Sequence, residues 1–136
     1  FGFLTSNNSV IPGLSVEQNI ELPLLAAGIG SVDIKEKLER VAEDFLIKDL
    51  LKKTPESLTL VQLKQVLVAK AFSHNPKVIF IDEFASELIP SEKAAIYETI
   101  FEYSRGRNIT LFIASDDISI CSKATKLIRL ESGKIS

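Results

Sequence analysis

The chain has 136 residues, of which 46% are hydrophobic and 25% are charged, a composition typical of one globular domain with a hydrophobic core. A net charge of -2 argues against a nucleic-acid partner, and a single cysteine excludes an internal disulfide and favours a reducing compartment. No apolar run approaches the roughly 18 residues that a membrane span needs. Because the chain starts at Phe1 and has no methionine, we expect a processed product or an excised piece of a longer protein.

The first elements are short. An apolar stretch from Phe1 to Leu4 predicts the end of a β-strand, and the polar residues 5–9 predict a loop. Ser15 and Gln18 match a capping box, in which the serine hydroxyl and the glutamine side chain satisfy the first free N–H groups of a helix. Pro23 is expected to limit or kink this helix.

Two further helices are predicted in the front half. Ser31 is expected to cap an amphipathic helix. Its apolar residues recur at helical spacing: Ile34, Leu38, Val41, Ala42 and Phe45. A third helix is predicted from Thr59 to Phe72, and because it is apolar on most sides we expect it to be buried against other elements.

The pattern changes after residue 76. Val78 to Ile81 is a run of β-branched and aromatic residues, typical of a strand that is covered on both faces in a parallel sheet. A helix is expected to begin at Ser91 and to end at Gly106, and Thr110 to Ile113 predicts a second buried strand.

The remaining residues predict a short helix over 117–123, a third strand over 127–130, and a turn over 131–134 that leads into a last short strand. Alternating strands and helices predict an α/β fold with right-handed crossovers. The chain is therefore divided into a helical front, Leu14 to Pro76, and an α/β rear, Lys77 to Ser136.

Two carboxylates carry the strongest chemical signal. Asp82 and Glu83 directly follow the strand at Val78 to Ile81, and ligands bind at this edge of open α/β sheets. In P-loop NTPases the aspartate holds Mg²⁺ and the following glutamate can polarise the attacking water. The alternative is a strand that simply ends in acidic residues at the surface.

Several other segments of the chain match a known protein family in their order and spacing. They are Ile11 to Leu24, Leu58 to Phe72, Asn75 to Lys77 before the acidic strand, and Ala124 to Ile135. With these segments the whole chain resembles the ABC-transporter nucleotide-binding domain, especially the branch that serves lipoprotein-release and macrolide-export transporters.

The resemblance implies a partial P-loop NTPase (ABC ATPase) fold, with a helical subdomain followed by a mostly parallel sheet with flanking helices. Residues 1–13 would be a remnant of the Q-loop strand and loop, and residues 14–76 the helical subdomain with its signature helix. Residues 77–136 would be the C-terminal part of the RecA-like α/β core.

The signature segment departs from the family pattern. The resemblance places the signature at Leu58, Thr59, Leu60, Val61 and Gln62, with two glycines expected at positions 60 and 61. Those glycines let bare backbone N–H groups at a helix N-terminus approach the γ-phosphate. The side chains of Leu60 and Val61 are expected to block this approach.

Three other family positions are also substituted. The Q-loop glutamine falls at Ser6, the D-loop aspartate at Ile89, and the switch histidine at Ser115, beside a retained Asp116. The phosphate-cradling motif Gly-x-x-x-x-Gly-Lys-Ser/Thr does not occur in the sequence. Because that clamp supplies most of phosphoryl-transfer catalysis, we expect no ATP hydrolysis by this chain alone.

The resemblance implies ATP and Mg as cofactors, with none expected to be bound by this chain alone. Asp82 would hold Mg if nucleotide is bound, and Glu83 occupies the catalytic Walker B position. Implied partners are transmembrane transporter subunits and either a second ATP-binding subunit or another copy. This places the protein in the cytoplasm at the inner face of the membrane. The apolar residues between Leu14 and Ala27 are one predicted docking surface.

Three functions remain open: a degenerate ABC-transporter ATP-binding chain, an active ABC ATPase whose P-loop portion is absent from this chain, and a soluble interaction module that has kept the fold. Other reactive residues receive structural interpretations. His74 suits the end of a helix, and Cys121 suits packing in a short helix. Asp116 and Asp117 favour helix N-capping over a metal pair.

Overall fold

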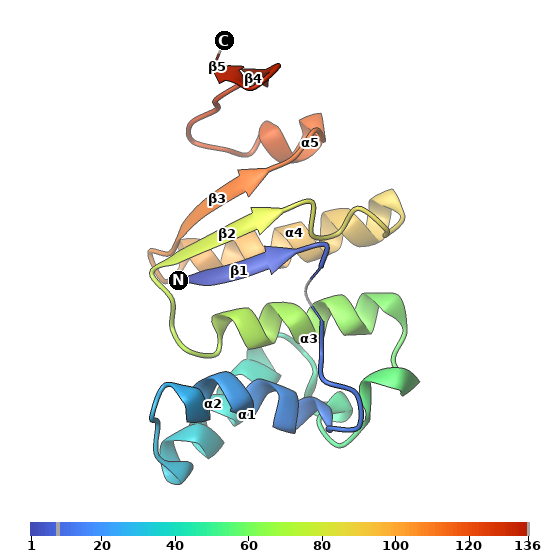
Figure 1. Cartoon of the computed structure of the whole chain (residues 1–136), viewed down its shortest axis with the longest axis vertical. Helices are drawn as coiled ribbons and strands as arrows, with labels where there is room; N and C mark the ends of the chain where they lie inside the picture. Colours follow the sequence, from blue (N-terminus) through green and yellow to red (C-terminus); the bar gives the residue numbers. More distant parts are fainter. Residues whose placement is uncertain (8, 136) are drawn as a thin grey trace.

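The computed structural model describes residues 1–7 and 9–135 of the chain. A three-stranded parallel sheet forms its centre, with β1 (Gly2–Thr5), β2 (Val78–Asp82) and β3 (Thr110–Ala114) in that spatial order (Figure 1). The register pairs Thr5 with Asp82 and Asp82 with Ala114. The three strands therefore end together at one edge of the sheet.

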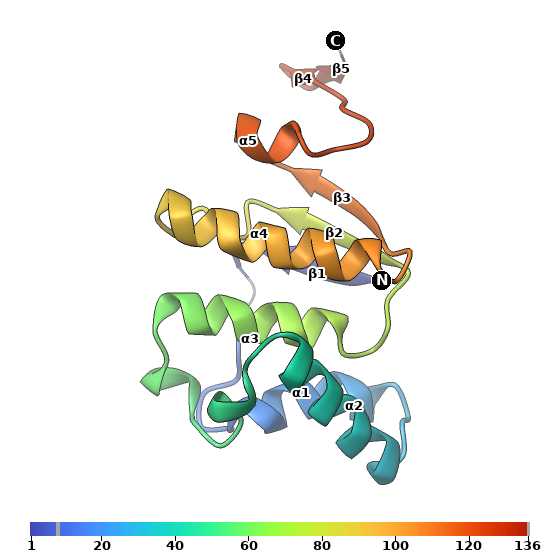
Figure 2. The same cartoon turned by 180° about the vertical axis from the view of Figure 1, so that it is seen from behind.

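The main helices lie on one side of this sheet. The main helices are α1 (Val16–Ala26), α2 (Ser31–Asp44), α3 (Leu60–Phe72) and α4 (Pro90–Arg105), followed by the single turn α5 (Ile118–Cys121). Two one-turn 3₁₀ helices, Lys48–Leu50 and Pro55–Ser57, connect α2 to α3. From behind, α4 lies in front of the sheet and α3 below it, with α1 and α2 farther out (Figure 2). The expected helical segment followed by a mostly parallel sheet is confirmed.

The helix starts follow from local hydrogen bonding. The predicted capping box of α1 is present, because the Gln18 N–H donates to Ser15 Oγ at 3.2 Å and the Ser15 N–H donates to Gln18 Oε1 at 2.8 Å. Pro23 lies inside α1, which continues to Ala26. The prediction that Ser31 caps α2 is wrong, since Gly30 is the N-cap and Ser31 is the first helical residue.

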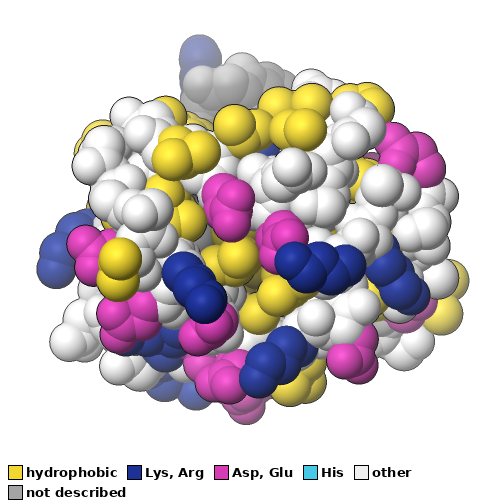
Figure 3. All heavy atoms as spheres, turned by 90° about the horizontal axis from the view of Figure 1, so that it is seen from below, with side chains coloured by type: hydrophobic (Ala, Val, Ile, Leu, Met, Phe, Trp, Pro, Cys, Tyr) yellow, Lys and Arg dark blue, Asp and Glu magenta, His cyan; other side chains and the backbone are white. Residues whose placement is uncertain are grey.

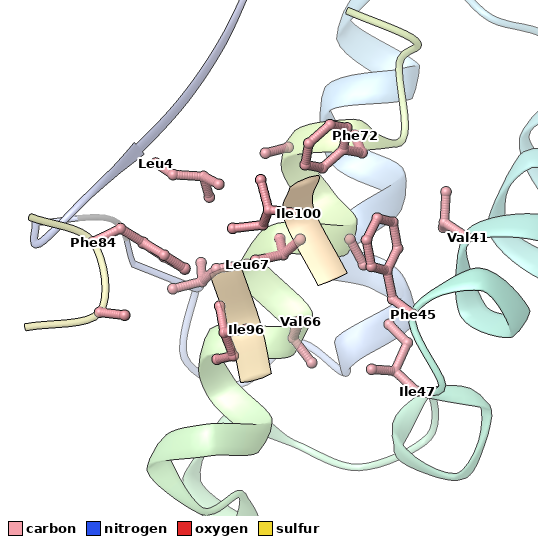
Figure 4. Packing of buried hydrophobic residues seen from close by; sticks show 14 of the residues in the cluster. Leu4, Val41, Phe45, Ile47, Val66, Leu67, Phe72, Phe84, Ile96 and Ile100 are labelled. Atoms are coloured by element: carbon pink, nitrogen blue, oxygen red, sulfur yellow. The ribbon is translucent and has the colours of Figure 1, made fainter. Parts of the chain in front are cut away.

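One hydrophobic core joins the sheet to the helices (Figure 4). Leu4, Ile79 and Ile81 point from the strands toward α3 and α4, where Phe72 and Ile100 are also fully buried. Burying a side chain of this size stabilises a fold by about 1.5–3 kcal/mol. Because the core uses strands and helices from both halves of the sequence, neither half closes it alone.

The prediction that the strands are covered on both faces is wrong. Successive strand residues point to opposite faces, and α3 and α4 cover only one of them. Phe80 on the other face is 37% exposed, and Phe112 beside it is 57% exposed. For the same reason Thr110 to Ile113 is not a buried strand, because its residues are only partly buried or exposed.

The tail also differs from the prediction. Of residues 127–130 only Leu130 is in a strand, β4 (Leu130–Glu131), which pairs antiparallel with β5 (Lys134–Ile135) in a separate hairpin. Leu127 and Ile128 are mostly exposed, so no core holds this segment against the sheet. Thr5 completes β1 instead of starting the expected loop; Asn8 of that loop and the terminal Ser136 lie outside the described residues.

Candidate functional site

The carboxyl-terminal edge of the sheet gathers four of the predicted site positions: Ser6, Asp82, Glu83 and Ser115. Parallel strands in register place Thr5, Asp82 and Ala114 side by side, so Ser6, Glu83 and Ser115 follow at the same edge (Figure 1). Ligand sites of open α/β sheets form at this edge. The structure thus brings together the positions that the family resemblance assigns to the Q-loop, the Walker B glutamate and the switch histidine.

Glu83 has an unusual backbone conformation. Its φ of 50° lies in the left-handed region, which residues other than glycine rarely adopt, and its N–H donates to the Ala114 carbonyl at 3.3 Å. Tyr97 of α4 is buried close by. Burial raises the pKa of Tyr97 to about 12, with the charges of Glu83, Asp117 and Asp82 adding to the effect. Several carboxylates therefore act on one buried phenol at this edge.

Ser115 has a local structural role. Its Oγ accepts a hydrogen bond from the Asp117 N–H at 3.1 Å, and its carbonyl lies 3.7 Å from Cys121 Sγ. The hydroxyl at the predicted switch position therefore helps to shape the loop that leads into α5. A serine side chain is also shorter than that of histidine and carries no ring nitrogen for proton transfer.

The predicted capping role of Asp117 is confirmed. Asp117 is the N-cap of α5 and accepts from the Ser119 N–H at 2.9 Å, and it pairs with Lys93 Nζ at 3.2 Å. Hydrogen bonds from Ser119 and Lys93 lower its pKa to about 2. Within residues 1–7 and 9–135, no cluster of three or more His, Cys, Asp or Glu side chains is arranged to hold a metal ion.

The signature positions lie at the start of α3, on the same side of the molecule as the strand ends (Figure 1). Thr59 is the N-cap: its Oγ1 accepts from the Gln62 N–H at 3.2 Å, and its N–H donates to Gln62 Oε1 at 3.0 Å. This capping box uses two N–H groups inside the chain. Leu60 follows as the first helical residue and is 44% exposed, and Val61 is partly buried.

A link between this helix and the acidic edge was not predicted. Lys64 of α3 is 3% exposed, lies 4.9 Å from the centre of the Phe84 ring, and pairs with Glu87 at 3.3 Å. Phe84 and Glu87 belong to the loop after β2. A lysine within a mostly apolar helix was visible in the sequence, but its partner 23 residues later could not be identified without the fold.

The structure also places the other singled-out residues. Ile89, at the predicted D-loop position, is the N-cap of α4 and makes no side-chain capping hydrogen bond. His74 lies just beyond α3, and its Nε2 makes a 3.1 Å hydrogen bond with the Phe1 carbonyl. Cys121 ends α5 and is partly buried.

The predicted docking surface of α1 is largely used for internal packing. Val16, Ile20 and Leu24 are fully buried, whereas Leu25 is exposed. Seen from below, this end of the molecule carries charged side chains of both signs interspersed with hydrophobic ones (Figure 3). Among the described helices, none combines the length and the apolar character needed to cross a membrane.

No protein-family model matches the chain. It is 29% identical over 133 residues to the ABC transporter ATP-binding protein YtrE of Bacillus subtilis, covering 98% of this chain and 58% of that protein. It is 25% identical over 134 residues to the lipoprotein-releasing system ATP-binding protein LolD of Legionella pneumophila, covering 59% of it. The chain thus spans less than two thirds of the length of these relatives.

A solved structure gives the same result. CbiO1 from Clostridium perfringens, described as part of the ABC transporter complex CbiONQ, superposes with a TM-score of 0.79 and 25% identity, covering 88% of this chain and 48% of CbiO1. The fold is therefore a partial P-loop NTPase fold of the ABC ATPase type. Within that class, the resemblance to the ABC-transporter ATP-binding domain, in its lipoprotein-release-like branch, is confirmed over 98% of the chain.

Proposed function

We propose that the chain is part of an ABC-transporter ATP-binding subunit or domain that is catalytically degenerate and couples to, or regulates, a membrane transporter. The observation that carries this proposal is the start of α3. There the Thr59–Gln62 capping box occupies two backbone N–H groups, and Leu60 projects, partly exposed, from the first helical position. A phosphate cannot approach a helix N-terminus closely past a leucine as it can past a glycine.

The same proposal covers the cofactors. ATP and Mg belong to the family by resemblance, and Asp82 and Glu83 are the residues of this chain that would face them. The side chains at positions 6 and 115 are short hydroxyls, and the Ser115 hydroxyl is engaged by the Asp117 N–H. We therefore expect these residues not to hold ATP-Mg by themselves.

Phosphate release by the purified 136-residue chain tests this proposal. In the presence of ATP-Mg we expect the same rate for the chain, for Glu83→Gln, and for buffer alone. Glu83→Gln is a conservative change at a partly exposed side chain, so it is expected to remain folded. Steady release by the unmodified chain that Glu83→Gln abolishes would overturn the proposal and favour the active ATPase.

That active ATPase is the second candidate, and one observation favours it. Asp82 and Glu83 are both retained at the sheet edge, and Glu83 is held in a left-handed conformation of the kind that clusters at functional sites. The substitutions at Ser6, Leu60, Val61 and Ser115 argue against it, because they fall inside the part that is present.

The proposed partners are transmembrane transporter subunits, met from the cytoplasmic side of the membrane. Support comes from relatives that are named as ABC transporter ATP-binding proteins. Affinity purification of the tagged chain from detergent-solubilised membranes should recover a transporter subunit with several membrane-spanning helices. Purification without such a subunit would favour the soluble interaction module.

Self-association is a further partner proposal, supported by the open sheet. The rings of Phe3, Phe80 and Phe112 stack across the uncovered face at centroid separations of 5.4 Å and 5.3 Å. Exposed apolar faces and sheet edges template pairing with another chain. Light scattering should give a molar mass above that of the monomer, and Phe112→Lys should lower the measured mass toward that of the monomer. A monomer mass at every concentration would contradict self-association.

A further inference from the structure

The uncovered face of the sheet carries an ordered row of phenylalanine rings that ends beside a carboxylate. The register places Phe3, Phe80 and Phe112 side by side on the three strands, and their rings stack with interplanar angles of 16° and 18°. Asp82 lies two residues beyond Phe80 and therefore on the same face. In the part of the chain that the structure describes, Asp82 forms no ion pair. The face is thus apolar with negative charge at one end.

The C-terminal hairpin, β4 with β5, has an apolar side that nothing in its own chain covers. Leu130 pairs with Ile135 across the hairpin, and the two side chains are 66% and 75% exposed. Cross-strand partners point to the same face. An isolated two-stranded hairpin is only marginally stable in water, so this one needs a surface to pack on. Both views place it beyond α5, away from the phenylalanine row (Figures 1 and 2).

The hairpin and the residues that lead into it are basic. Residues 124–135 contain Lys126, Arg129 and Lys134 but only one acidic residue, Glu131. Among residues 1–7 and 9–135, none of these three cations takes part in an ion pair. A basic segment with an exposed apolar side therefore complements, in both charge and polarity, an apolar face that ends in a carboxylate. A second copy of the chain presents both surfaces.

We propose that the hairpin of one copy packs on the phenylalanine row of a second copy, an inference that rests on the self-association proposed above. Leu130 and Ile135 lie against the rings of the partner copy, and the basic residues beside them meet the partner's Asp82. The contact is reciprocal, so two copies cover two sheet faces with two hairpins. Twofold arrangements of this kind are the commonest among homo-oligomers.

A spin label on the hairpin identifies the sheet that it covers. One set of chains carries the label at Ser132→Cys, in the hairpin turn, with Cys121→Ser so that no other cysteine reacts. These chains are mixed with isotope-labelled chains that carry no spin label. We expect broadening of the ring signals of Phe80 and Phe112 in the isotope-labelled copies. The same label at Lys53→Cys, an exposed position between α2 and α3, is the control and should leave those signals unchanged.

Light scattering of the same samples separates this inference from self-association itself. A mass above that of the monomer without broadening would keep self-association and overturn the hairpin contact. A further sample, in which the same chains carry both labels, tests the hairpin against its own sheet. Broadening in that sample alone, unchanged on dilution, would show that the hairpin folds onto its own copy and would also overturn the proposal. A monomer mass at every concentration would contradict both proposals.

Substitutions measure the apolar and the charged parts of the contact. Leu130→Ser should raise the dimer dissociation constant at least about tenfold, because an apolar contact is lost in both copies. Leu25→Ser, at an exposed leucine of α1, is the matched control and should leave the constant unchanged. Asp82→Lys should also weaken the dimer, whereas Glu39→Lys, at an exposed position of α2, should not. Equal effects of the two leucine changes, or of the two charge changes, would contradict the proposal.

Discussion

The family resemblance assigns contacts with ATP-Mg to two regions, the end of β2 and the start of α3. The two regions differ in how many of the side chains expected for those contacts are present. The end of β2 keeps both carboxylates, Asp82 and Glu83, at the edge of the sheet. The start of α3 has the capping box that begins the helix, but Leu60 and Val61 stand where the resemblance leads us to expect glycines.

This difference distinguishes residues that stabilise the fold from residues that would contact ATP-Mg. The Thr59–Gln62 box stabilises the helix whatever stands between its two residues, so α3 forms without the family glycines. Asp82 needs no partner to stay at the surface, because a strand end is solvated. We propose that packing and capping preserve the fold in both regions, while the positions that the resemblance assigns to phosphate contact are substituted in one of them.

The largest expected effect tests this separation within β2. Ile81 is 1% exposed, and Ile81→Ala should lower the free energy of unfolding by about 2–5 kcal/mol, because it opens a cavity beneath the sheet. The next residue is exposed, and Asp82→Asn should change stability by less than about 0.5 kcal/mol. Urea denaturation measures both. A loss of stability in Asp82→Asn comparable with that of Ile81→Ala would show that the carboxylate is structural.

A smaller effect tests the bridge between the two regions. Glu87→Gln leaves the buried ammonium of Lys64 without its ion-pair partner and should cost about 1–2 kcal/mol, reduced from a fully buried pair because Glu87 is half exposed. Lys64→Met removes the charge and keeps an apolar side chain, so it should cost less. Urea denaturation again measures both variants. A larger loss of stability in Lys64→Met than in Glu87→Gln would show that packing of the lysine stem dominates.

The capping box should contribute about 1 kcal/mol. Thr59→Ala removes the acceptor for the Gln62 N–H and should lower stability by this amount, whereas Thr59→Ser keeps the hydroxyl and should be close to neutral. Thermal unfolding of both variants provides the measurement. If the alanine variant were as stable as the serine variant, the box would not be what holds the start of α3.

The smallest effect concerns protonation beside Ser115. The pKa of Asp117 is about 2 in the folded chain, against roughly 3.9 for an unfolded aspartate. Its contribution to stability is therefore complete above about pH 4 and is lost as the pH falls toward 2. Carboxyl NMR titration should find the lowered pKa, and Ser119→Ala should raise it. An ordinary pKa in the unmodified chain would contradict the hydrogen bonding described for this loop.

Much of the fold could be predicted from local patterns. The capping pair Ser15–Gln18 and the strand run at 78–81 depend on neighbouring residues, and the structure confirms them. The exposed face of the sheet could not be predicted, because a strand with an apolar sequence can be covered on one face or on both, and its sequence does not distinguish the two cases. Sequence placed Ser6, Glu83 and Ser115 after separate strands, but only the parallel register aligns them.

The other features that the sequence analysis missed also depend on residues that are distant in the sequence. The predicted strand at 127–130 has apolar residues but, among the described residues, only a two-residue partner in its own hairpin. The Lys64–Glu87 pair depends on how α3 packs against the loop after β2. The roles assigned to the site residues, and the division of the chain at residues 13 and 76, stay predictions.

The central claim, that this chain does not bind ATP-Mg by itself, is tested most directly by isothermal titration calorimetry. ATP with excess Mg²⁺ is titrated into the folded 136-residue chain, with Asp82→Asn in parallel. The account predicts no saturable heat for either protein. A dissociation constant in the micromolar range for the unmodified chain, weakened by Asp82→Asn, would contradict it.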